Sequence, residues 1–271
     1  MKNLDSPTKI TLPTLQSHLL SYESHVPDKI QKLESLRVND IPETLAQRKK
    51  VGNAFLEKNE VTSLVEWKLK HGTYRPNLAK LVASNSIKEI RDTTKSAFAI
   101  YEANNDDFAK SISTLTNLKG IGPATASLLL SCYDSVKVPF FSDELYRYLH
   151  FEEAASKGWD RKINYTMKEY KSLFEKLQTL RKRLEKESKQ DVSAIDVERM
   201  AYVLGKEAPT KDPDTITSTG IDDENEDETN DGLLRPPPKR QKKNPPKSEP
   251  LSKSREPNPK PKSKNKPPLI P

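Results

Sequence analysis

The chain has 271 residues, enough for one well-buried domain with further sequence to spare. Its net charge of +7 favours nucleic acid or another anionic surface as a partner. The single cysteine, Cys132, excludes an internal disulfide framework and a four-cysteine iron–sulfur or zinc site, and its apolar setting indicates a small core residue. No apolar run approaches the roughly 18 residues of a membrane span, and a signal-peptide core is missing, so we expect a protein of a soluble, reducing compartment.

Residues 1–40 have a mixed character and predict an arm that packs on the domain beginning at residue 41. Within this arm, apolar residues from Leu12 to Tyr22 are spaced for one short helix. A clearer helix begins near Pro42, which suits a first turn, and Gly52 interrupts it. The residues expected on its buried face are Leu45, Val51, Phe55 and Leu56.

Four further helices are predicted before residue 118. Residues 59–72 carry an apolar stripe, and Gly72 suits the end of that helix. Pro76 opens the next helix, and Asn85 or Ser86 caps another that runs past Ile100. Polar residues at 105–107 are cap candidates for a helix through Leu115. The alternation of a half-buried strand is missing from these segments, so we expect an all-α domain over 41–205.

Residues 118–130 form the segment most informative about function. Gly120 and Gly122 flank an isoleucine, and Pro123 follows at once. Glycine permits a positive φ and close backbone approach, while proline suits the first residue of a helix. The pattern predicts a helix, a tight turn and a second helix whose first N–H groups offer a seat for a phosphate. The alternative is a helix–helix turn that binds no ligand.

A second segment of interest, residues 138–145, contains Pro139 and then Asp143, which follows Gly122 by 21 positions. Asp143 is a candidate catalytic carboxylate. Ser142, Asp143 and Glu144 also compose an ordinary helix N-terminus, where the helix dipole favours acidic residues. From the sequence these two interpretations of Asp143 carry about equal weight.

The region after Asp143 predicts three more helices. A short helix includes 145–149, and 158–160 is a loop. Thr166, followed three residues later by Glu169, has the spacing of a capping box and begins a long helix. Its basic residues 181–183 lie among acids and indicate a salt-bridged helix face. Ser193 is expected to cap a last helix that ends at Gly205.

Residues 206–271 have a different composition. They hold 14 of the 21 prolines and no aromatic residue, and an acidic run precedes a basic, proline-rich run. Such a segment buries too little apolar surface to offset its ordering entropy, so we expect it to be disordered. Its basic cluster is typical of a nuclear-import signal, or of nonspecific contact with DNA. The residues of that signal are Lys239, Arg240, Lys242 and Lys243, which imply an import receptor as partner and the nucleus as location.

The glycine turn and the Pro139–Asp143 segment together resemble the helix-hairpin-helix DNA glycosylase superfamily. The resemblance implies a two-lobed helical fold, DNA as the partner, and a monovalent cation near the hairpin carbonyls. Asp143 would stabilise positive charge on the sugar as the base leaves and help to activate water. Backbone and side-chain groups of the hairpin would hold a DNA phosphate; these are Leu118, Lys119, Gly120, Ile121, Gly122 and Thr125.

Bifunctional members of this superfamily place a Schiff-base lysine where this chain has Ala124. A lyase that uses this position is therefore not expected, and the resemblance implies a monofunctional DNA glycosylase with water as nucleophile. Lys119 is interpreted as a phosphate contact. The alternative function is a non-catalytic DNA-binding or scaffold protein that kept the hairpin and lost the chemistry. A subunit of a larger chromatin or repair assembly is a third possibility, suggested by the tail.

Enzymes that flip a base stack it on aromatic side chains, and four residues are candidates for such a pocket. They are Trp67, Tyr74, Trp159 and Tyr165. Packing in the core is the alternative for each. The strip 67–75 mixes cations and aromatics as nucleic-acid surfaces do, although a solvated helix face explains it equally well. The four histidines lack metal-ligand spacing, so we expect neither zinc nor another cofactor.

Overall fold

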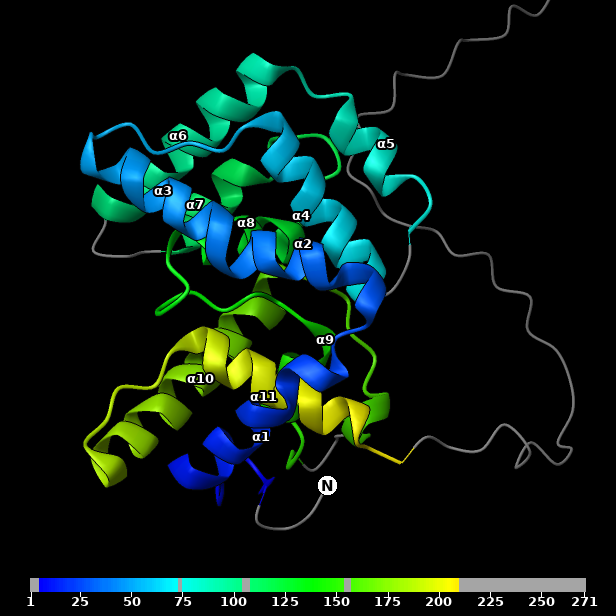
Figure 1. The fold of residues 1–271 in the computed structure, drawn as a ribbon, viewed down its shortest axis with the longest axis vertical. Coiled ribbons are helices and arrows are strands. Elements are labelled where there is room, and N and C mark those ends of the chain that lie inside the picture. The colour runs from blue at the N-terminus through cyan, green and yellow to red at the C-terminus, as the bar shows by residue number, and fades with distance from the viewer. Residues whose placement is uncertain (1–4, 73–74, 104–107, 154–156, 210–271) are drawn as a thin grey trace, which may run out of the picture. The chain divides into compact units, whose positions relative to one another are not determined.

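The computed structural model describes residues 5–72, 75–103, 108–153 and 157–209, and these residues form helices joined by turns, with no strand among them (Figure 1). The predicted all-α class is therefore confirmed for this part of the chain. In chain order the α-helices are α1 (Leu12–His25), α2 (Gln31–Ser35), α3 (Ile41–Lys50), α4 (Lys58–His71), α5 (Leu78–Ala83), α6 (Ile87–Ala103), α7 (Phe108–Leu115), α8 (Pro123–Tyr133), α9 (Asp143–Leu149), α10 (Met167–Ser188) and α11 (Ala194–Lys206).

The N-terminal residues contribute to the core of the domain. α1 packs along α11 near the other end of the described chain (Figure 1). Ile10 and Leu15 are both buried in the apolar core cluster that extends to Leu204. α2, a π-helical turn at Leu36–Asp40 and α3 follow one another without a break, so this helical stretch already begins at Gln31, ahead of Pro42. Residues 5–40 are therefore integral to the folded unit.

The helix predicted around Pro42 ends earlier than its apolar pattern suggested. Val51 is the C-cap residue of α3 and is 77% exposed, so its expected place on a buried face is wrong. The cause is Gly52, whose φ of +67° turns the chain away from the helix direction. Leu45 is buried on α3 as predicted, whereas Phe55 and Leu56 follow the end of the helix, where Phe55 is half-buried and Leu56 is buried.

α8 is the central helix of the domain. Its residues from Ala124 to Cys132 are all buried, which matches a helix that is apolar on every side. α3, α4, α7 and α10 all contact it. Cys132 is 4% exposed, and burial raises the pKa of its thiol to about 12, so it is a core residue as predicted.

The last two long helices begin where their capping residues predicted. Thr166 and Glu169 form a capping box at the start of α10, and the helix ends at Lys189 in a left-handed conformation. Ser193 accepts a hydrogen bond from the Asp196 N–H at the start of α11. In the basic stretch of α10, Arg183 pairs with Glu187, whereas Arg181 is buried and donates to the Val192 carbonyl at 2.5 Å.

A buried set of charges links the first and last parts of the described chain. Arg37 pairs with Glu198 of α11 and lies 3.7 Å from Glu34, and all three side chains are at least nine-tenths buried. The Arg37 guanidinium lies 4.1 Å from the centroid of the Trp67 ring. Trp67 donates from Nε1 to Glu34 Oε2 at 2.6 Å. We refer to these four residues as the Arg37 cluster.

Some predicted features lie outside the described residues. These are Tyr74, the cap candidates at 105–107, and the import residues Lys239, Arg240, Lys242 and Lys243. Within the described ranges, no helix combines the length and apolar character that crossing a bilayer requires. The same ranges contain no group of three or more His, Cys, Asp or Glu side chains arranged to hold a metal ion.

Candidate functional site

The glycine turn joins α7 to α8 and is tightly packed on α5. Gly120 has a φ of +77°, and a Cβ atom added there would lie 3.0 Å from Leu81 Cβ and 3.2 Å from the Val82 nitrogen. Both the backbone conformation and the contact with α5 therefore require glycine at 120. The Ile121 N–H donates to the Leu118 carbonyl at 3.1 Å and closes the turn.

Asn85, two residues after the end of α5, also holds the turn in place. Its side-chain amide donates to the Lys119 carbonyl at 3.0 Å, and its Oδ1 accepts from the Lys119 N–H at 2.9 Å. Asn85 is 2% exposed, so this pair of bonds is protected from water. The sequence offered Asn85 or Ser86 as a helix cap. Ser86 takes that role, since its hydroxyl accepts from the Glu89 N–H at 3.1 Å.

The start of α8 offers unoccupied backbone donors. Gly122 is the N-cap residue, it is exposed, and it supplies no side-chain cap. The first bond of the helix runs from the Ala126 N–H to the Gly122 carbonyl at 2.9 Å, so the N–H groups of Ala124 and Thr125 precede it. A Cβ at Gly122 would meet nothing within 4 Å, which leaves this end of the helix open to a ligand.

The six predicted phosphate-binding residues differ in what they present. Leu118 and Ile121 are buried and their N–H groups donate within the turn, while the Lys119 side chain is exposed. Thr125 is 4% exposed, so its side chain does not face solvent. The carbonyls of Leu118 and Lys119 each accept a hydrogen bond already. Each of these two oxygens keeps a second lone pair, and a monovalent cation at the turn stays a prediction.

Asp143 is the first residue of α9, but its carboxylate does not cap that helix. Ser142 has that function, because its hydroxyl accepts from the Leu145 N–H at 3.2 Å. Asp143 Oδ1 accepts a hydrogen bond from the Tyr165 hydroxyl at 2.7 Å. Its Oδ2 lies 3.6 Å from Arg147 Nη2, and the side chain is 22% exposed. The carboxylate therefore contacts the side chains of Tyr165 and of Arg147, one turn along α9, and leaves the cap of the helix to Ser142.

Asp143 lines a small pocket of about 20 Å³, which has room for roughly one water molecule. Its walls come from the end of α4 and the residues after it, from the start of α9 and from the turn before α10. The lining residues are Lys68, His71, Gly72, Arg75, Phe140, Phe141, Ser142, Asp143, Glu144 and Tyr165. We call this the Asp143 pocket. A nucleobase does not fit unless a wall residue moves.

Tyr165 closes the pocket beside Asp143. Its φ of +56° is unusual for a residue with a bulky side chain and stores backbone strain. The Arg75 guanidinium lies 5.2 Å from the centroid of the Tyr165 ring. A change in the Tyr165 side chain would break its bond to Asp143 and open the pocket.

Burial shifts the pKa values of several pocket groups. It lowers the pKa of Lys68, and the nearby Arg75 adds to this effect while Asp143 opposes it. It raises the pKa of the Glu144 carboxyl, because an ion is poorly solvated there. It lowers the pKa of His71 well below its ordinary value, with Arg37 and Lys206 acting in the same direction. The His71 imidazole therefore stays neutral at physiological pH.

The structure brings together only part of the aromatic set predicted for a base pocket. Tyr165 lines the Asp143 pocket, but Trp67 has no exposed surface and belongs to the Arg37 cluster, so core packing is its role. Trp159 is half-buried and packs against Phe151, with ring centroids 5.7 Å apart. Lys68, His71 and Arg75 were not predicted from the sequence as site residues. The only feature of the sequence that pointed to them was the segment 67–75, which mixes cationic and aromatic residues.

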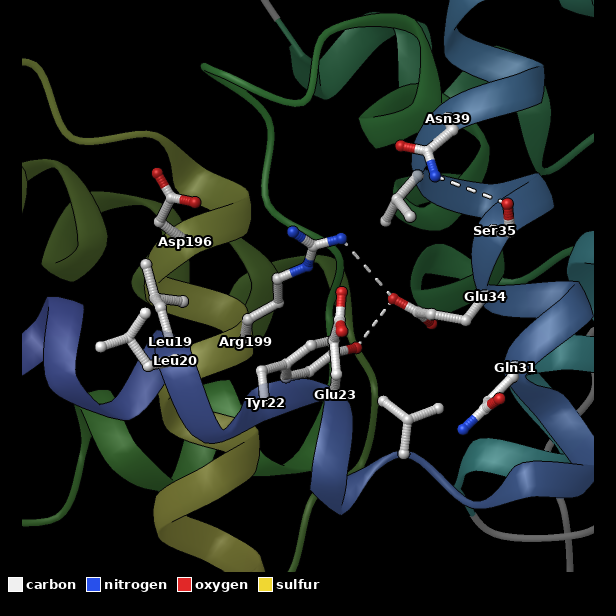
Figure 2. A pocket seen from close by; sticks show the side chains of 12 residues that line it. Leu19, Leu20, Tyr22, Glu23, Gln31, Glu34, Ser35, Asn39, Asp196 and Arg199 are labelled. Atoms are coloured by element: carbon white, nitrogen blue, oxygen red, sulfur yellow. Dashed lines mark hydrogen bonds and ion pairs between the residues drawn. The ribbon is translucent and has the colours of Figure 1, made fainter.

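A second, wider pocket of about 720 Å³ lies between α1, α2 and α11 (Figure 2). Arg199 points into it beside Glu34, with 3.8 Å between Nη2 and Oε1. The Tyr22 hydroxyl donates to Glu34 Oε1 at 2.8 Å on the same side. Leu20 at the rim is 89% exposed. No sequence motif predicted this pocket.

The comparisons with known proteins found no match. No family model matches the chain, and no curated protein or solved structure is significantly similar to it. A functional assignment therefore depends on the geometry of the turn and the Asp143 pocket.

Proposed function

We propose that this chain is a nuclear DNA-binding protein that holds a backbone phosphate at the start of α8. The observation that carries the proposal is the open N-terminus of α8 at Gly122, presented by a turn that Asn85 and α5 hold in place. Unoccupied N–H groups and the positive end of the helix dipole favour a phosphate at this position. The exposed Lys119 side chain adds a cation beside it. The basic cluster at 239–243 would direct the chain to the nucleus through an import receptor.

We further propose a monofunctional DNA glycosylase reaction at Asp143, as the two-lobed glycosylase fold would allow. A carboxylate beside the sugar stabilises the positive charge that develops as the glycosidic bond breaks. The Asp143 pocket has space for one water molecule next to this carboxylate, and that water is the proposed nucleophile. Movement of Tyr165 would make room for the sugar. The reaction is proposed to be monofunctional because Ala124, in the first turn of α8, has no amine that could form a Schiff base.

The alternative is a DNA-binding protein without catalysis. One observation favours it, which is the 2.7 Å bond from the Tyr165 hydroxyl to Asp143 Oδ1. That bond occupies the oxygen the reaction needs, and it closes the pocket to a base. The two functions share the DNA-binding turn and differ only in whether Tyr165 releases Asp143.

Phosphate binding at the turn can be tested with Gly122→Glu in the full chain. A Cβ atom at 122 would meet no protein atom within 4 Å, so the fold should tolerate a side chain there, whereas the carboxylate of glutamate should repel a phosphate. We expect roughly tenfold weaker binding to a duplex. The slope of the logarithm of the binding constant against the logarithm of the salt concentration should become less steep by about 0.9 for each phosphate that the chain no longer neutralises. Fluorescence anisotropy at several salt concentrations measures both quantities.

Gln190→Glu is the matched control, because it changes the net charge by the same amount at an exposed site in the α10–α11 turn. It should bind DNA within about twofold of the unmodified chain, as expected for a single remote surface charge. Equal loss of affinity in Gly122→Glu and Gln190→Glu would show that the start of α8 does not contact DNA.

Catalysis can be tested by incubating the chain with duplexes that carry damaged or mismatched bases, followed by chemical cleavage of abasic sites. We expect base release by the unmodified chain and its loss in Asp143→Asn, which keeps the shape and removes the charge. Release that persists in Asp143→Asn would exclude the proposed role of this carboxylate. If neither the unmodified chain nor Tyr165→Phe processes any duplex that it binds, the non-catalytic function is the correct one.

A further inference from the structure

The wider pocket of about 720 Å³ separates two pairs of packed helices (Figure 2). α1 packs on α11 along one side, and α2, which packs on α4, lies on the other. Leu20 and Arg199 line the pocket from the first side, and Gln31 and Asn39 line it from the second. Among the described residues, none lines both this pocket and the Asp143 pocket, so the two are separate sites.

Contacts between side chains hold the floor of the wider pocket in place. The Tyr22 hydroxyl of α1 donates to Glu34 Oε1 of α2 at 2.8 Å. Arg199 Nη2 of α11 lies 3.8 Å from the same Glu34 oxygen, and its guanidinium lies 5.0 Å from the centroid of the Tyr22 ring. These contacts tie the two sides of the pocket to each other, so its shape is part of the fold and does not depend on a ligand.

The rim of the wider pocket exposes apolar surface. Leu20 is 89% exposed and is the most exposed large apolar side chain among the described residues. Leu19, next to it, and Val38, on the facing side, are half-buried and also line the pocket. α1 already buries Leu15 and Tyr22 in the domain, so Leu20 lies off the buried face of its helix. Its apolar surface can be removed from water only by another molecule.

The lining of the wider pocket is acidic, although the chain as a whole has a net charge of +7. Four lining side chains ionise, and three of them are carboxylates: Glu23, Glu34 and Asp196. The fourth, Arg199, lies against Glu34 in the floor. Asp196 accepts a hydrogen bond from the Ser193 hydroxyl, but neither it nor Glu23 has an ion pair within 4 Å among the described residues. This local excess of negative charge repels phosphate and favours a cationic partner.

We propose that the wider pocket binds a cationic amphipathic helix of a partner protein. Apolar side chains on one face of that helix pack on Leu20 and its apolar neighbours at the rim, and a lysine or arginine beside them pairs with Glu23 or Asp196. A helix presents both kinds of side chain together, because residues three and four positions apart share a face. This binding is independent of the proposed DNA contact, which uses the turn before α8.

The composition of the wider pocket favours a peptide over a small molecule. Pockets for small molecules, of about 300–1,000 Å³, are lined mainly by apolar and aromatic side chains. Here most of the lining is polar, and the pocket opens to solvent. Gln31 and Asn39 are exposed at its edge and present amide groups that can bond to a bound chain.

The test is selection with the full chain from a displayed library of helical peptides in which leucine, alanine, lysine and glutamate vary at every position. We expect the enriched peptides to carry leucines on one face with lysines beside them. A chain of net charge +7 would by itself select peptides rich in glutamate, so the sign of the enriched charge distinguishes the pocket from nonspecific attraction.

The affinity of an enriched peptide, synthesised with a fluorescent label, is then measured by anisotropy with variants of the full chain. Leu20→Ser should weaken binding by about tenfold, because it removes the apolar contact at the rim. Glu23→Lys should weaken it by about fivefold, since repulsion replaces attraction. Both side chains are exposed, so the fold should tolerate both changes, and circular dichroism checks this.

Val51→Ser and Glu175→Lys are the matched controls. Val51 is also an exposed large apolar residue, and Glu175 is exposed on α10; neither lines the wider pocket. Each should bind the peptide within about twofold of the unmodified chain, as expected for a surface change away from the site. Enrichment of glutamate-rich peptides, failure to enrich any peptide, or full affinity in Leu20→Ser would overturn the proposal.

Two further measurements test other occupants of the wider pocket. Self-association of the chain alone, measured by sedimentation and lost in Leu20→Ser, would assign the pocket to a second copy and overturn the proposal. A synthetic peptide of residues 233–243 that binds as tightly as the enriched peptide, and loses affinity in Glu23→Lys, would assign it to the chain's own sequence instead. We expect no self-association and weaker binding of that peptide. Leu20→Ser should retain its affinity for a DNA duplex, so failure here leaves the DNA-binding proposal intact.

Discussion

The Arg37 cluster and the Asp143 pocket both gather charged side chains around aromatic rings, but they satisfy those charges differently. In the Arg37 cluster, the guanidinium of Arg37 is paired with Glu198, lies near Glu34 and covers the Trp67 ring, all away from solvent. In the Asp143 pocket, the carboxylate is 22% exposed and the nearest Arg147 nitrogen is 3.6 Å away.

The difference separates a structural role from a functional one. Charges enclosed among partners from α2, α4, α11 and the π-helical turn hold those segments in one arrangement, and of these charges Glu34 also lines the wider pocket. Around Asp143, the cationic Lys68 and Arg75 lie in the same wall, and no acid among the described residues neutralises them within 4 Å. Such a site still attracts an anion, for example a phosphate group of DNA.

The largest expected effect that tests this comparison follows from removing Arg37. Arg37→Met should lower the free energy of unfolding by about 3–5 kcal/mol, because it leaves the carboxylates of Glu34 and Glu198 buried without their cation. Urea unfolding followed by circular dichroism measures this change. Adding Glu198→Gln to Arg37→Met should recover part of the loss, since the uncompensated charge is then removed.

Arg75→Met is the matched control from the Asp143 pocket. Arg75 is exposed, and its contact with the Tyr165 ring should contribute no more than about 1 kcal/mol. Similar destabilisation by Arg37→Met and Arg75→Met would mean that the two regions do not differ in the way we describe.

A smaller effect concerns His71, which lines the Asp143 pocket and contacts the Arg37 cluster. Its ring stacks on Trp67 with centroids 4.4 Å apart, and it also lines the Asp143 pocket. Because burial lowers the pKa of His71, the folded state binds fewer protons than the unfolded state at mildly acidic pH. Stability is therefore complete above the ordinary pKa near 6.5 and declines as the pH falls below it, by up to about 1.4 kcal/mol per pH unit for this one group.

Urea unfolding at pH 7.5, 6.5 and 5.5 should reveal this slope, and His71→Phe should reduce it. Burial also lowers the pKa of His150, so part of the slope should remain in the variant. A slope of equal steepness in the unmodified chain and His71→Phe would show that His71 does not link stability to pH.

The sequence by itself determined the features that depend on short-range rules. The capping residues Thr166 and Ser193 predicted the starts of α10 and α11, because a cap bonds to backbone only three residues away. The glycines and Pro123 predicted the turn between α7 and α8 for the same reason. The all-α class follows from helical spacing within each segment. DNA binding and the role of Asp143 remain predictions from these motifs.

Only the tertiary structure decided which distant residues share a site. Asn85 clamps the Lys119 backbone from 34 positions away, and Lys68 reaches the same pocket as Asp143 from another helix. Trp67 lies in the core instead of a base pocket because Glu34 and Arg37 surround it. Such contacts depend on how helices pack, and a pattern of spacing along one helix shows which face is apolar but not which neighbour covers it.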